Sequence, residues 1–135
     1  MTHRSLLSIA LGAALALAAL NPAVAGDTTP AQQQARWSAE AGAPANAARG
    51  QTFFTGRHGG EWSCASCHGQ PPTADGKHAS TGKTIAPLAP AFNAKAFTNT
   101  AKADKWFRRN CKDVLSRECS AAEKADVLAY LNSLK

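Results

Sequence analysis

The sequence predicts an all-α domain. Several segments carry helix start signals or an apolar stripe with helical spacing, and no segment shows the alternation that is typical of a strand. A long stretch rich in proline and glycine separates the early helical segments from the late ones. With 135 residues, the chain has the length of one domain. We therefore expect helices around a single core, with one extended loop between them.

Residues 1–25 have the features of a secretory signal peptide. Arg4 precedes an uncharged apolar run over residues 5–20, and small residues stand just before Gly26, as a signal peptidase requires. A retained membrane anchor is the alternative, but this run is shorter than the roughly 20 residues that span a bilayer. We expect a cleaved signal over residues 1–25 and a periplasmic domain over residues 26–135, without a membrane span.

The mature chain is basic. Without Arg4, 14 Lys and Arg residues face nine Asp and Glu residues, which gives a net charge of +5. A positive surface suits nucleic acid, a membrane surface or an acidic protein partner. Export argues against nucleic acid, and the charges are scattered along the sequence. A solvated surface and docking to an acidic redox partner both remain open.

Four helices are predicted in the mature chain. Thr29 followed by Pro30 is typical of a helix start, and Gly42 ends that helix. Further helices are expected over residues 46–55, from near Thr100 through Val114, and after Ser120. The last one begins with a capping-box pair at spacing three and continues with an apolar stripe, formed by Val127, Leu128, Leu131 and Leu134.

Residues 69–93 have neither helical nor strand periodicity. A structureless loop of this length is uncommon in a small domain. It can stay ordered if it wraps a large planar cofactor, which would also supply apolar surface that a chain of this size lacks.

The strongest motif is Cys64-Ala65-Ser66-Cys67-His68. Two thiols three positions apart can form thioethers with the two vinyl groups of one haem, and the following His ligates the iron. A redox dithiol would require a βαβ context, which is absent, and a zinc site would recruit the two later cysteines. We expect one covalently bound haem c, attached through Cys64 and Cys67, with His68 as an axial ligand.

The later cysteines, Cys111 and Cys119, cannot attach a second haem because neither is followed by His. In an oxidising compartment a disulfide between them is expected, and zinc ligation or free thiols are the alternatives. The pair lies just after Asn110, so the bridge is expected to lock the turn there.

The second axial ligand is not Met, because the only Met in the chain is Met1. His58 and His78 both lie within ten residues of the attachment motif, in glycine-containing loops. Either would give a permanently ligated iron. Lysine ligation is possible in principle but has no positional support.

Three stretches resemble the sphaeroides haem protein family of class I cytochromes c: residues 81–90 (TGKTIAPLAP), 105–111 (KWFRRNC) and 123–131 (EKADVLAYL). The resemblance implies a class I cytochrome c-like helical fold. It also implies that Asn110 is the sixth haem ligand in the oxidised state and that Cys111 is bonded to Cys119. Members of this family bind oxygen and nitric oxide when reduced, and they take electrons from a dihaem cytochrome c.

The class I pattern also implies a helix crossing. Gly50 and Phe54 match the spacing of the N-terminal helix in that class, and Val127 and Tyr130 resemble their partners on the last helix. A glycine at the crossing would let the two backbones approach closely.

A neutral amide is a weak ligand, so Asn110 could bind ferric iron and leave ferrous iron. The alternative is that Asn110 only caps the end of its helix. The sequence thus predicts a monomeric, exported electron carrier with a labile Asn110 ligand and a site for a diatomic gas (oxygen, nitric oxide or carbon monoxide). A shuttle with permanent bis-His ligation and an enzyme acting on oxygen, peroxide or nitric oxide are the alternatives, and no acid–base residue is evident for the enzyme.

Overall fold

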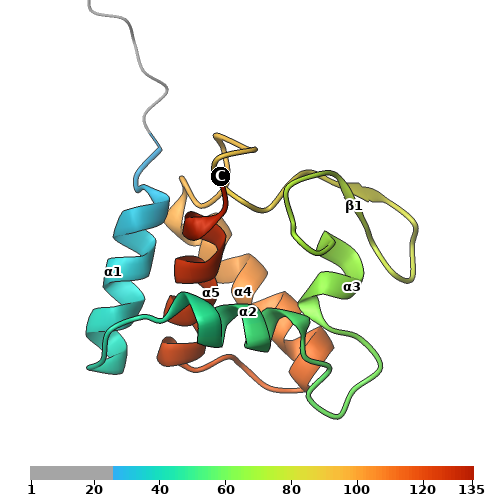
Figure 1. The fold of residues 1–135 in the computed structure, drawn as a ribbon, viewed down its shortest axis with the longest axis horizontal. Coiled ribbons are helices and arrows are strands. Elements are labelled where there is room, and N and C mark those ends of the chain that lie inside the picture. The colour runs from blue at the N-terminus through green and yellow to red at the C-terminus, as the bar shows by residue number, and fades with distance from the viewer. Residues whose placement is uncertain (1–25) are drawn as a thin grey trace, which may run out of the picture.

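The computed structural model describes residues 26–135, so the predicted signal peptide lies outside the described part of the chain. These residues form five helices and one short hairpin (Figure 1). The elements are α1 (Pro30–Ala41), α2 (Ala47–Thr55), α3 (Cys64–His68), β1 (Gly76–Lys77), β2 (Thr84–Ile85), α4 (Thr100–Leu115) and α5 (Ala121–Ser133). Among the described residues, no helix is long and apolar enough to cross a membrane.

The predicted all-α fold is confirmed, with two small differences. The attachment motif forms a helix of its own, α3, which was not among the four predicted helices. Within residues 69–93, where no strand was expected, β1 and β2 pair antiparallel, with Gly76 opposite Ile85. Each strand has only two residues. That length cannot show a period of two in the sequence, which is why the hairpin was missed.

Helices α1 and α5 begin with the predicted caps. The Oγ1 of Thr29 accepts a hydrogen bond from the backbone N–H of Gln32, whose side chain accepts one from the N–H of Thr29. Ser120 and Glu123 exchange the same pair of bonds at the start of α5. Each pair satisfies two backbone donors that a helix start leaves without partners.

Helix α5 lies between α1 and α2 and contributes more buried apolar residues than any other helix or strand of the described chain (Figure 1). On the α1 side, Trp37 packs with Ala125 and Leu128. On the α2 side, Phe54 packs in a second cluster, together with Val127, Tyr130 and Leu131. The predicted stripe is therefore buried over most of its length, and Leu134 packs half-buried at its end.

The start of α4 is fastened to the beginning of the described chain. The carboxylate of Asp27 accepts hydrogen bonds from the backbone N–H of Thr100, at 2.8 Å, and from its hydroxyl, at 3.2 Å. The side chain of Gln33, buried in α1, donates to the same hydroxyl at 3.1 Å. The first turn of α4 therefore has a fixed place beside α1.

Helices α2 and α5 cross in direct backbone contact. A Cβ added to Gly50 would lie 1.9 Å from the carbonyl oxygen of Asp126, far inside any allowed contact. The Asp126 carboxylate, only 7% exposed, accepts hydrogen bonds from Arg49 Nε at 2.7 Å and from the backbone N–H of Asn46 at 2.6 Å. The glycine and the ion pair together hold the N-terminal half of α2 against α5.

Replacing Gly50 with Ala should therefore destabilise the holoprotein by about 3 kcal/mol or more, because a helix backbone cannot yield as a side chain does. Ala has the higher helix propensity, so a loss of this size identifies the crossing as its cause. The control is Gly42→Ala. Gly42 has a φ of +65° and open space around it, so only its left-handed backbone opposes the change, at about 1 kcal/mol. Equal losses in guanidinium-induced unfolding would contradict the crossing.

Candidate haem site

Helix α3 is a short helix that gathers the three residues of the attachment motif. At its start, Ser63 Oγ accepts a hydrogen bond from the backbone N–H of Ser66, and Ser66 Oγ accepts one from the N–H of Ser63. This double cap supports a helix of five residues that is too short to persist alone. Because successive residues turn by about 100°, Cys64, Cys67 and His68 project from the same side of α3.

The two cysteines of α3 are free thiols and half-buried. Burial raises the pKa of the Cys64 thiol to about 11. The Sγ of Cys67 accepts a hydrogen bond from the backbone N–H of Ala79 at 3.3 Å. Neither sulfur takes part in a disulfide, so both can bond covalently to another group.

His68 is held by aromatic packing. Its ring lies 6.3 Å from the ring of Phe54, measured between centroids, and burial lowers the pKa of its imidazole. The neutral imidazole that results is the form that binds iron. Its buried Nδ1 has no hydrogen-bond partner among residues 26–135.

These residues fit a haem c. Two free thiols at spacing three and a neutral imidazole on one helix face form the donor set that covalent attachment and axial ligation require. A buried imidazole nitrogen without a partner is costly in the protein alone. The unpaired nitrogen of His68 is therefore consistent with a side chain that has a cofactor as its main partner.

The segment after α3 turns back against the attachment helix. A Cβ added to Gly76 would lie 2.1 Å from the carbonyl oxygen of Cys67, so only glycine fits there. Closer to α3, the carbonyl of Pro72 accepts hydrogen bonds from the backbone N–H groups of Leu88 and Ala89 at the far end of the loop, both at 3.1 Å. Leu88 also packs against the core cluster of Phe54. The loop is therefore ordered by contacts at both ends.

The two loop histidines are engaged close to their own positions in the chain. His58 lies at hydrogen-bond distance from the carbonyl of Phe53, 2.8 Å from its Nε2, and stacks on the Phe53 ring at 4.5 Å. The Nδ1 of His78 accepts a hydrogen bond from the backbone N–H of Thr81 at 3.3 Å. Ligation by His58 would break its contact with the carbonyl, whereas the contact of His78 leaves its Nε2 free.

Asn110 lies inside α4, which continues to Leu115 and ends at Ser116 in the left-handed conformation. The interpretation of Asn110 as a helix cap is therefore wrong. The structure agrees instead with the helix predicted through Val114, which passes Asn110 without a break.

Asn110 is half-buried and follows Phe107 by three residues, so both lie toward the same side of α4. Phe107 packs against the core cluster around Phe54, and so does Cys64. The side of α4 that carries Asn110 and the attachment helix therefore border one shared core.

Cys111 and Cys119 form a disulfide with a Cα–Cα distance of 5.5 Å. It connects α4 to the residue before the N-cap of α5. The intervening turn follows Leu115, rather than Asn110 as the sequence indicated. The cysteines bonded to each other cannot join Cys64 in a zinc site, and within residues 26–135 no group of three or more potential metal-binding side chains converges.

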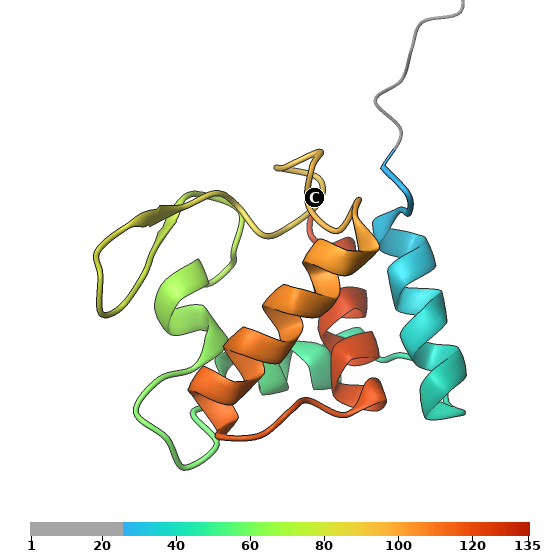
Figure 2. The same ribbon diagram turned by 180° about the vertical axis from the view of Figure 1, so that it is seen from behind.

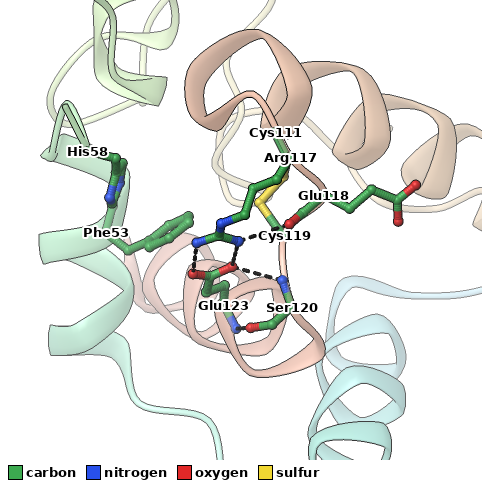
Figure 3. The surroundings of a disulfide bond; sticks show 8 residues. All are labelled: Phe53, His58, Cys111, Arg117, Glu118, Cys119, Ser120 and Glu123. Carbon is green, nitrogen blue, oxygen red and sulfur yellow. Dashed lines mark hydrogen bonds and ion pairs between the residues drawn. A yellow bond between two sulfur atoms is a disulfide. The ribbon is translucent and has the colours of Figure 1, made fainter. Parts of the chain in front are cut away.

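An ion pair braces the turn that the disulfide closes (Figure 3). The Arg117 guanidinium donates two hydrogen bonds to the Glu123 carboxylate, at 2.7 and 2.8 Å, and a third to the backbone carbonyl of Glu118. The hydrogen bonds from Arg117 lower the pKa of the Glu123 carboxyl. The same carboxylate caps α5 through the N–H of Ser120, so the turn and the helix start are one unit.

Comparison with known proteins agrees with this site. A family described as a domain of unknown function, DUF1924, matches residues 40–131. Cytochrome c-type protein SHP of Cereibacter sphaeroides is 49% identical over 82% of this chain and 88% of its own length. The chain belongs to the SHP family of c-type cytochromes. Its cofactor is therefore a covalently bound haem c, as predicted from the attachment motif.

Solved structures of SHP-like cytochromes share the fold. Oxidised SHP, described as an oxygen-binding cytochrome c, superposes with a TM-score of 0.73 at 47% identity, covering 81% of this chain and all of that one. Oxidised cytochrome c″ of Methylophilus methylotrophus gives a TM-score of 0.69 at 34% identity, covering 78% and 94%. The class I cytochrome c-like fold and the predicted family are thus confirmed.

Covalent attachment predicts that haem stays with the denatured chain. After extraction with acidified organic solvent, the wild-type band on a denaturing gel should keep its haem-dependent peroxidase stain. Cys64→Ala or Cys67→Ala should weaken the stain, because each removes one thioether. The paired variant Cys111→Ala/Cys119→Ala is the matched control and should keep it. Haem that extracts fully from the wild type would contradict attachment.

The disulfide predicts a loss of stability on reduction. Closing a loop with a sequence separation of eight stabilises by about 2.5 kcal/mol on the chain-entropy estimate. The Cys111→Ala/Cys119→Ala holoprotein should therefore unfold at lower denaturant concentration than the wild type. Adding a thiol reductant should lower the wild-type midpoint toward that of the variant and leave the variant unchanged. A reductant effect of equal size in both proteins would refute this role.

Proposed function

We propose that the chain is an exported, periplasmic electron-transfer cytochrome with one haem c, whose iron releases Asn110 on reduction and then binds a diatomic gas. In this proposal the signal peptide is removed after residue 25, and His68 and Asn110 are the two axial ligands. The observation that carries it is the place of Asn110, half-buried on the side of α4 that borders the core of the attachment helix. Residues 26–135 contain no Met that could take this role instead.

A bound haem would supply a one-electron iron centre, and His68 and Asn110 are the residues that would hold its iron. His68 offers an imidazole whose ring is packed against Phe54, so it stays in place in both oxidation states. Asn110 offers a neutral amide, a weaker donor that gains more from ferric than from ferrous iron. Asn110 would therefore be the residue that holds ferric iron and gives up its place on reduction, and the chemistry that the haem would supply there is binding of the gas.

The relatives support both halves of this proposal. The solved SHP structure is described as that of an oxygen-binding cytochrome c. A solution structure of cytochrome c″ from Methylophilus methylotrophus, 35% identical with a TM-score of 0.64, is described as giving insights into haem-ligand detachment. A gas-binding iron and a detachable ligand therefore occur among cytochromes of this fold.

The competing bis-His shuttle has weaker support. The contact between His58 and the Phe53 carbonyl would have to break, and both histidines are anchored in loops within ten residues of the attachment motif. Electrons are proposed to come from a redox protein, for which the family resemblance suggests a dihaem cytochrome c.

The decisive variant is Asn110→Ala in the holoprotein. The ferric spectrum should change from six-coordinate low-spin to high-spin or water-bound, because the amide is lost. Carbon monoxide binding to the reduced protein should change by less than about threefold, because Asn110 has already left in that state. Absorption spectra and flash photolysis measure both quantities.

Asn132→Ala is the matched control, since its side-chain amide donates only to the Pro30 carbonyl and the Gln34 side chain of α1, and its spectra should match the wild type. Asn110→His should give a ligand that persists on reduction and slows carbon monoxide binding. A wild-type ferrous spectrum that is six-coordinate, low-spin and indifferent to carbon monoxide would refute the proposal and favour His58 or His78.

A further inference from the structure

The solvent-facing side of α4 carries a concentration of positive charge. Helix α4 runs along the outside of the molecule, in front of α2 and α5 in the view of Figure 2. We call its exposed basic side chains the basic stripe: Lys102, Lys105, Arg108, Arg109 and Lys112. The helix has only two acidic residues, and one of them, Asp104, is paired with Arg36 of α1. Five of the 14 Lys and Arg residues of the described chain thus lie on one exposed side of one helix.

Trp106 stands at the edge of this stripe. It is 45% exposed, and among residues 26–135 Phe92 is the other large apolar side chain exposed to this degree. The guanidinium carbon of Arg109 lies 5.3 Å from the indole centroid, and the ammonium nitrogen of Lys105 lies 6.0 Å from it. An exposed Trp beside Arg is the combination enriched at the centres of protein interfaces.

The stripe lies beside the proposed ligand without covering the core. At about 100° per residue, Lys105 and Arg109 project well away from Phe107, which packs inward. Trp106 precedes Asn110 by four residues, so it lies between the stripe and the ligand on the helix surface. A protein seated on the stripe would therefore approach the haem across one helix.

We propose that the basic stripe and Trp106 form the docking surface for an acidic redox protein. This inference rests on the proposed electron-transfer function. In the exchange, one electron passes from the reduced partner to ferric haem, so the partner is oxidised and the haem reduced, and no bond between the proteins forms or breaks.

Charge complementarity indicates that the partner of the basic stripe is an acidic protein. A negative protein surface would pair with the five exposed cations and accelerate encounter at low salt. An anionic membrane is less suited, because the apolar residues of α4, such as Phe107 and Cys111, face the core and cannot insert. One indole is a small apolar surface for membrane binding.

The test uses the ferric holoprotein and, as a probe, a small acidic flavodoxin in its hydroquinone form. Stopped-flow absorbance follows haem reduction at several salt concentrations. The variant Lys105→Glu/Arg109→Glu should slow the second-order reaction tenfold or more at low salt, and the difference should shrink toward 0.5 M salt, where screening is nearly complete on the scale of about 4 Å. The matched control is Lys77→Glu/Lys83→Glu, the same charge change at two exposed hairpin residues. It should slow the reaction less than threefold.

Equal slowing by both pairs would show that net charge alone acts, and no slowing by the α4 pair would show that the stripe is not used; either result overturns the proposal. Binding of the wild type, but not of the α4 variant, to phosphatidylglycerol vesicles with unchanged flavodoxin kinetics would assign the stripe to a membrane instead. Carbon monoxide binding is measured on the same reduced samples. Normal binding with unaffected kinetics refutes the docking surface alone, whereas absent binding refutes the gas site alone.

Discussion

The close crossing of α2 over α5 is the constraint on which the rest of the structure depends. Gly50 lets the α2 backbone rest on the carbonyl of Asp126, and a methyl group would not fit between them. Three residues after Gly50, α2 turns Phe53 toward the disulfide end of the molecule (Figure 3). In the next position it places Phe54 in the core. A change at the crossing would therefore move two aromatic residues at once.

Phe54 connects the hydrophobic core to His68 of the haem-attachment motif. On one side it stacks with Tyr130 of α5 at 5.6 Å between ring centroids, and on the other it lies against the His68 imidazole. The orientation of the His68 imidazole, the proposed iron ligand, is thus set by packing that begins at the helix crossing. In a chain of this size, the residues that stabilise the fold and the residues that position the cofactor cannot be separate sets.

Much of the fold and part of the site could be predicted from the sequence. The caps at Thr29 and Ser120 and the attachment motif are short-range patterns, whose physical meaning does not depend on distant residues. The role of Gly50 was recognisable only through a family pattern, because the residue that it contacts, Asp126, is far away in the sequence. The helical spacing through Val114 already predicted that α4 passes Asn110, but the turn closed by the disulfide was expected just after Asn110, and only the three-dimensional structure places it after Leu115. The buried charge of Asp126 and the gathering of basic residues on α4 likewise depend on which faces pack together.

Helix α4 is fastened at both ends, by Asp27 at Thr100 and by the disulfide at Cys111. A helix held in this way resists swinging or sliding as a rigid body. If its Asn110 side chain leaves the iron, the movement is then a rotation about side-chain bonds, which takes place in picoseconds to nanoseconds for accessible rotamers, whereas displacement of a whole helix takes microseconds or longer. The gate would be local and fast, and gas capture would follow the arrival of the electron without waiting for the fold to rearrange.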